Sequence, residues 1–144
     1  MSDNWTEVTT CWQGEMAFFA ENAKGGKVQM STLDETPAVG PMQLLLAALG
    51  GCTGMDIVSI LKKKRLDLKD FKVSVRGKRA EDYPMVWTDI EVTYLLWGND
   101  LNTRDVEQAI ELSEEKYCSV GIMLGKSASI KSSYRIFKPG ESFG

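Results

Sequence analysis

Two cysteines lie where a thiol could react. Cys52 is in the glycine-rich segment 50–56, GGCTGMD, and Cys118 is in the segment 117–121, YCSVG. The chain has no histidine, so the imidazole base that most often activates a nucleophilic side chain is missing. A reactive thiolate would need Lys, Arg or a helix N-terminus to stabilise it. The residues leave two hypotheses open, a redox pair or two buried thiols.

The surroundings of Cys52 favour close packing. Asp56 lies one helical turn after Cys52, and this carboxylate would disfavour a thiolate unless a cation lies between them. Gly50 and Gly54 share a face, although each interior glycine costs a helix about 1 kcal/mol relative to alanine. We therefore expect this ridge to meet a partner helix closely. Taken alone, Cys52 is a small buried cysteine in a tight helix crossing.

The position of Cys118 favours a reactive thiol more strongly than the position of Cys52 does. It follows a long helix, and residues 119–124 can begin a new helical turn. A thiol at a helix N-terminus lies near partial positive charge and unpaired N–H donors, which lower its pKa. Cys11, in an early strand, has no such neighbourhood, and we interpret it as a packing residue.

The elements that must position these thiols follow from periodicity. A helix from Pro41 to about Arg65 is apolar over most of its circumference, which predicts a central helix covered on several sides. Its polar interruptions (Gln43, Thr53, Asp56 and Ser59) favour a buried helix over a membrane span. A second helix is predicted from residues that recur at helical spacing and form its inward face: Val106, Ala109, Ile110, Ser113 and Tyr117.

The remaining segments predict strands. Short strands are expected within 5–31, a loop over 34–41, a hairpin with strands near 71–75 and 88–96, and a last strand over 128–136. The chain shows no repeat and no linker. We therefore predict a single α+β domain over residues 1–144.

Composition limits the partners. The 144 residues include 17 Lys and Arg against 20 Asp and Glu, a net charge of −3, which disfavours a nucleic-acid partner. The N-terminus lacks the features of a signal peptide, and three cysteines do not make a disulfide scaffold, so we expect a cytoplasmic protein that binds no membrane. Three scattered cysteines without histidine also argue against a zinc site, and no cofactor is expected.

The two cysteine motifs together are similar to those of a known family. The segments 40–56, GPMQLLLAALGGCTGMD, and 117–120, YCSV, resemble the OsmC/Ohr family of thiol-dependent peroxidases, and within it the branch named after YhfA. The resemblance covers most of the chain. It implies an OsmC-like α+β fold, with antiparallel sheets around a long central helix, in an intertwined homodimer that forms two sites at its interface.

The resemblance also implies a mechanism. Cys52 would be the peroxidatic thiolate that attacks a hydroperoxide or another small electrophile and becomes a sulfenic acid. Cys118 would resolve it as a disulfide, which a dithiol or protein reductant would reduce. This would be a peroxide reductase of the oxidative stress response that needs no metal or organic cofactor.

One departure leaves a second function open. The family's better-known peroxidases place an Arg against the thiolate and orient it with a Glu. Here no Arg precedes Arg65, and Gln43 stands at the matching Glu position. Lys24 or Lys27 could supply the cation, without the planar fork of Arg. The alternative is a non-catalytic protein that holds a small ligand in an apolar pocket at the dimer interface.

Overall fold

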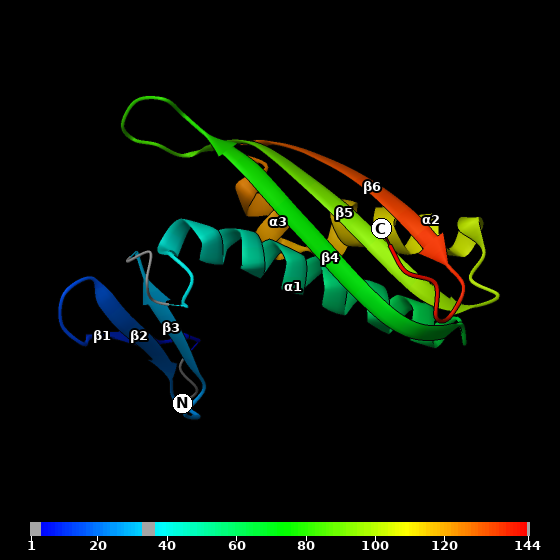
Figure 1. Cartoon of the computed structure of the whole chain (residues 1–144), viewed down its shortest axis with the longest axis horizontal. Coiled ribbons are helices and arrows are strands. Elements are labelled where there is room, and N and C mark those ends of the chain that lie inside the picture. Colours follow the sequence, from blue (N-terminus) through cyan, green and yellow to red (C-terminus); the bar gives the residue numbers. More distant parts are fainter. Residues whose placement is uncertain (1–3, 33–36, 144) are drawn as a thin grey trace. The chain divides into compact units, whose positions relative to one another are not determined.

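The N-terminal unit of the chain is a small antiparallel sheet. The computed structural model describes residues 4–32 and 37–143, which form two compact units that divide after Leu45. In the first unit, β1 (Val8–Trp12), β2 (Ala17–Asn22) and β3 (Lys27–Ser31) pair in chain order, as Figure 1 shows in blue. The predicted strands are confirmed. Of the predicted loop over 34–41, residues 34–36 lie outside the described part.

The C-terminal unit has a mixed sheet. The strands β4 (Asp67–Arg79), β5 (Trp87–Asn99) and β6 (Ser129–Phe137) lie in this order. The hairpin β4–β5 is antiparallel, whereas β5 and β6 are parallel. Parallel neighbours need a long crossover, which consists here of α2 (Thr103–Leu112), η1 (Ser113–Tyr117) and α3 (Ser119–Leu124). The α+β class is therefore confirmed, but the expectation of antiparallel sheets is wrong for the pairing of β6 with β5.

The long helix α1 (Pro41–Lys63) lies beside this sheet (Figure 1). It buries one narrow stripe of side chains. The buried residues recur every fourth position: Leu49, Thr53, Ile57 and Leu61. On other faces Met55 is 76% exposed and Val58 is 43% exposed. Within one chain, the expectation of a helix covered on several sides is therefore not met.

The glycine ridge of α1 faces a strand of its own chain. A Cβ atom added at Gly50 would lie 3.4 Å from Val75, and one added at Gly54 would lie 3.5 Å from Val73, so both glycines face β4. A Cβ at Gly51 would meet nothing within 4 Å. The glycine ridge that was expected to meet a partner helix thus allows α1 to approach the sheet closely. Among the three glycines of α1, only Gly51 points into open space.

By length and composition alone, α1 could also cross a membrane. Its most apolar 18-residue window has a mean hydropathy of 1.9, and 22% of that window is buried in the chain. Because its buried stripe and its two ridge glycines both face the same unit, α1 serves as the core helix of that unit.

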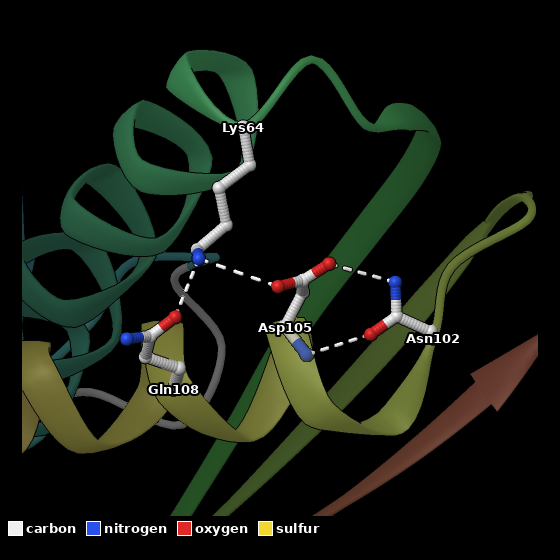
Figure 2. Close-up of polar contacts among 4 residues, drawn as sticks. All are labelled: Lys64, Asn102, Asp105 and Gln108. Carbon is white, nitrogen blue, oxygen red and sulfur yellow. Dashed lines mark hydrogen bonds and ion pairs between the residues drawn. The ribbon is translucent and has the colours of Figure 1, made fainter.

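A polar cluster ties the end of α1 to the start of α2 (Figure 2). The Lys64 ammonium lies 3.3 Å from Asp105 and also donates to Gln108. Asn102 caps α2 by accepting from the Asp105 backbone N–H, and its side-chain amide donates to the Asp105 carboxylate. The hydrogen bond from Asn102 and the contact with Lys64 lower the pKa of Asp105. These contacts fix the N-terminal end of the helix that leads to Cys118.

Candidate active site: a thiol pair beside a carboxylate

A π-helical turn places Cys118 in the interior. At the end of α2 the chain continues into η1, and the Cys118 N–H donates to the Ser113 carbonyl at 2.7 Å, five residues back. The additional residue in the turn rotates the following side chains. Tyr117, which helical spacing places on the inward face, is therefore 50% exposed, while Cys118 is 1% exposed. Single π turns inside helices occur frequently at functional sites.

The two motif cysteines meet, as predicted. The Sγ atoms of Cys52 and Cys118 and a carboxylate oxygen of Asp56 all lie within 4.8 Å of one another. Cys52 and Asp56 come from the same face of α1, and Cys118 comes from the junction of η1 and α3. Both cysteines are free thiols. A disulfide needs an S–S distance of about 2.05 Å, so a modest local movement would allow the bond.

In the reduced protein the Cys118 thiol stays protonated at neutral pH, because its pKa is raised. Its pKa is raised to about 11, chiefly by burial and with smaller contributions from the neighbouring Cys52 and Asp56, whereas the hydrogen bond from the Gly121 N–H lowers it. The expectation that a helix N-terminus lowers the pKa of Cys118 is therefore wrong in sign. The single N–H donor, 3.3 Å from the sulfur, does not offset the loss of hydration, because desolvation penalises the charged form.

A chain of hydroxyl groups leads away from Asp56. The Ser113 hydroxyl donates to Asp56 at 2.9 Å and lies 2.8 Å from the Thr53 hydroxyl. Thr53 in turn lies 3.0 Å from the Tyr94 hydroxyl, which donates to Glu114 at 2.8 Å. This network joins α1, β5 and η1, and it holds the Asp56 carboxylate beside the two thiols.

Thr53 is the hub of this network. It contacts both Ser113 and Tyr94, but one hydroxyl carries one proton, so Thr53 donates to one neighbour at a time. Burial raises the pKa of the Tyr94 hydroxyl well above its ordinary value, which keeps this proton in place near neutral pH. Thr53 is also buried, so water has little access to replace a lost contact.

Replacing this hub tests the network. We expect Thr53→Val, which preserves the shape of the side chain, to lower the free energy of unfolding by about 1–3 kcal/mol, because the buried hydroxyl oxygen of Ser113 or Tyr94 that accepts from Thr53 loses its donor. Urea unfolding at one fixed protein concentration measures the change. Thr9→Val, the same replacement at an exposed strand position, is the control and should shift stability by no more than about 0.5 kcal/mol. Equal stability of the two variants would show that the network contributes nothing.

A cavity lies against Cys118. Its volume is about 290 Å³, and it opens among α1, β5, β6 and α3. Thr53, Tyr94 and Glu114 provide polar groups in its wall, and the rest of the lining is mostly apolar or small: Leu49, Val92, Cys118, Gly121, Gly125, Ala128 and Ile130. The buried thiol therefore faces a space that could hold a small organic molecule.

The other residues predicted at the site belong to the N-terminal unit. Gln43 Oε1 accepts from the Gly40 N–H at 2.8 Å, so this side chain caps the start of α1. Lys27 lies over the ring of Phe19, 5.4 Å from its centroid, and the backbone N–H of Lys24 donates to Asn22. A supporting role for Gln43, Lys24 or Lys27 at the thiols stays a prediction.

The sequence interpretation missed Ser113, Tyr94 and Glu114. Helical spacing places Ser113 on the inward face of its helix, and Tyr94 lies within the strand predicted near 88–96. Both do face inward, and their hydroxyls supply the network. The available signal was the pair of hydroxyl side chains on faces predicted to be buried, because buried hydroxyls need hydrogen-bond partners.

The comparisons with known proteins identify the family. The family model described as OsmC-like protein matches residues 33–133. The chain belongs to the OsmC-like family. This OsmC-like chain is 38% identical to Protein YhfA of Escherichia coli (strain K12), over 87% of this chain and 93% of YhfA. The predicted family resemblance is therefore confirmed.

Solved structures share the OsmC-like fold. A hypothetical protein from Aquifex aeolicus VF5 matches with a TM-score of 0.84 and 34% identity, over 94% of this chain and 98% of that one. An organic hydroperoxide resistance protein OsmC from Legionella pneumophila matches with a TM-score of 0.65 and 16% identity, over 93% of this chain and 98% of that one. At that identity the likeness to the Legionella protein concerns the fold alone.

Proposed function

We propose that this OsmC-like protein reduces hydroperoxides through the Cys52–Cys118 pair. The observation that carries the proposal is the convergence of the two thiols within 4.8 Å, from segments that are far apart in the sequence. The family is consistent with this function, because structural neighbours include organic hydroperoxide resistance proteins. The cavity beside Cys118 offers room for the organic part of such a substrate.

Burial supports Cys52 as the attacking residue. Cys52 is half-buried, whereas Cys118 is 1% exposed and its pKa is about 11. The thiolate is the nucleophile toward peroxide, so the thiol that solvent and substrate can reach attacks first. Cys118 then serves as the resolving thiol, held in place until a sulfenic acid forms beside it.

The proposed reaction cycle has three steps. The Cys52 thiolate attacks the O–O bond of the hydroperoxide; the sulfur is oxidised to sulfenic acid, and the leaving alkoxide takes a proton and departs as an alcohol. The Cys118 sulfur then displaces the sulfenic hydroxyl, which leaves as water as the disulfide forms and the thiol proton is transferred. A dithiol reductant donates two electrons and two protons to restore both thiols.

Intact mass and thiol counting test the pair. Reduced protein treated with a series of hydroperoxides should lose two free thiols per chain and two mass units, and a dithiol should reverse both changes. Cys11→Ser should behave in the same way. A stable sulfinic or sulfonic product with no disulfide would contradict the resolving role of Cys118.

We also infer that a second copy of the chain covers the exposed face of α1. Met55 and Val58 are exposed there, and an open apolar groove of about 520 Å³ includes both of them with Gly51. Family resemblance implies an intertwined homodimer, and an apolar helix face of this kind is typical of an obligate interface.

Gly51 is the position that tests this interface. We expect Gly51→Leu to weaken dimerisation by at least tenfold, because a bulky side chain would enter a face that only a partner covers. Sedimentation velocity over a dilution series measures it. Gly51→Ala is the size control, and Gly50→Leu would be uninformative because that side chain collides with β4. Unchanged self-association of Gly51→Leu would place the interface elsewhere.

The alternative function, binding of a small ligand without catalysis, is favoured by the same cavity. It is mostly apolar with a few polar groups, as ligand sites usually are. If peroxides leave both thiols unchanged while an apolar fluorescent probe binds and Leu49→Trp blocks it, the ligand-binding function is supported in place of the redox one.

A further inference from the structure

The thiol pair and its carboxylate have the composition of a metal site. Two sulfurs and one oxygen, from Cys52, Cys118 and Asp56, lie within 4.8 Å of one another. Three protein ligands around one open position are the usual arrangement of a reactive zinc centre. With Zn–S near 2.3 Å and Zn–O near 2.1 Å, tetrahedral ligands lie about 3.5–3.8 Å apart. Shifts of roughly 1 Å would therefore close the site.

We propose that the reduced protein binds one Zn²⁺ ion per chain through Cys52, Cys118 and Asp56, with a water molecule in the fourth position. Two thiolates select a soft or borderline cation, and the single carboxylate is too few oxygens for Ca²⁺ or Mg²⁺. The sequence argument against zinc assumed scattered cysteines. The fold overturns that assumption, because η1 turns Cys118 toward the face of α1 that carries Cys52 and Asp56.

The groups behind the three ligands support this proposal independently. The Ser113 hydroxyl donates to Asp56 at 2.9 Å, and Thr53 and Tyr94 extend that hydrogen-bonded chain into the core. The Gly121 N–H donates to the Cys118 sulfur at 3.3 Å. Metal ligands are characteristically oriented by such outer hydrogen bonds. Cys52 and Asp56 are half-buried, which leaves a path for the ion.

Zinc binding and disulfide formation exclude each other on these sulfurs. A hydroperoxide that oxidises the loaded site takes two electrons from the two thiolates. With two protons from solvent it yields the disulfide, an alcohol, one water and the released Zn²⁺ ion. The site would therefore hold zinc under reducing conditions and release it on oxidation. Binding itself needs only the reduced thiols, so the proposal does not depend on the protein being a peroxidase.

Two probes test the site in the full-length reduced protein. Zn²⁺ affinity is measured by competition with a chromogenic chelator, and Co²⁺ is added as a spectroscopic probe. We expect one ion per chain and a thiolate-to-cobalt charge-transfer band in the near ultraviolet. Cys52→Ser and Cys118→Ser should each reduce that band by about half and weaken Zn²⁺ binding by at least about tenfold. Cys11→Ser, which removes the third thiol, should change neither measurement.

Asp56→Asn separates a built site from two adventitious thiols. Asparagine keeps the shape and can still accept from Ser113, so folding, checked by circular dichroism, should survive. We expect Zn²⁺ affinity to fall at least about tenfold in this variant. Undiminished affinity in Asp56→Asn, or equal Zn²⁺ binding by wild type and the Cys52→Ser, Cys118→Ser double variant, would overturn the proposal. Peroxide oxidation is measured separately on metal-free protein, so the experiments can reject zinc binding without rejecting peroxide reduction, and the reverse.

Discussion

Cys52→Ser should reduce hydroperoxide consumption by roughly 10³-fold or more, because it removes the nucleophile that forms the sulfenic acid. Cys118→Ser should behave differently. Its Cys52 thiolate can still attack once, but no neighbouring thiol resolves the product, so one equivalent of peroxide is consumed and turnover stops. Peroxide depletion with a dithiol reductant measures turnover, and a sulfenic-acid trapping reagent followed by mass spectrometry identifies the product.

The matched control is Cys11→Ser, which removes a half-buried thiol in β1 and should keep full turnover. Comparison of the Cys52→Ser and Cys118→Ser activities also shows which cysteine attacks first. If Cys118→Ser loses its first turnover while Cys52→Ser retains one, then the buried cysteine attacks first, and the assignment based on exposure is reversed. Full activity in both variants would reject the thiol pair altogether.

Cys118 should make the stability of the reduced protein fall in alkaline solution. Its pKa is about 11 in the folded protein, against an ordinary value of 9.0, so folding favours the protonated thiol. This contribution is fully present below pH 9 and is lost as the pH rises through 11. We expect the free energy of unfolding to decrease by about 2 kcal/mol more in wild type than in Cys118→Ser over this range. Urea unfolding at each pH, with reductant present, measures the difference.

Alkylation gives an independent reading of the same thiol. In the Cys11→Ser, Cys52→Ser protein, Cys118 should react at neutral pH at least about 100-fold more slowly when folded than when unfolded in urea, since a two-unit rise in pKa removes that much thiolate. Parallel pH profiles of the folded and unfolded protein would contradict a raised pKa. The same slow rate leaves Cys118 protected until a sulfenic acid appears on Cys52.

In the proposed peroxidase, Cys52 would have to be activated in a different way from the one that the family resemblance implies. The chain has no Arg before Arg65 and carries Gln43 where the family's better-known peroxidases have Glu, and Gln43 already accepts a hydrogen bond from Gly40. The proposed zinc ion would supply the missing positive charge at the sulfurs, since a coordinating thiol is deprotonated. Comparing peroxide reactivity in metal-free and zinc-loaded protein decides whether the ion activates the pair or protects it.

Much of the fold could be predicted from local patterns. Periodicity, which acts over a few neighbouring positions, predicts the apolar helix that begins at Pro41, the alternating strands of the β4–β5 hairpin and the inward face of the second helix. The parallel pairing of β6 could not be predicted in this way. It depends on the path of the crossover through α2 and α3, and alternation alone has the same appearance in parallel and antiparallel strands.

By itself, the sequence determined the family, the two cysteine motifs and their meeting, because both motifs have to be present for the resemblance. Only the tertiary structure decided what surrounds the sulfurs. The η1 turn places Cys118, and not Tyr117, on the buried face. Burial then raises the pKa of that thiol, against the expected lowering. Gly50 and Gly54 face β4, and not a partner helix. The burial of Cys118 and the packing of the two glycines depend on contacts between residues far apart in the chain, where desolvation and packing outweigh the local preferences that a sequence pattern records.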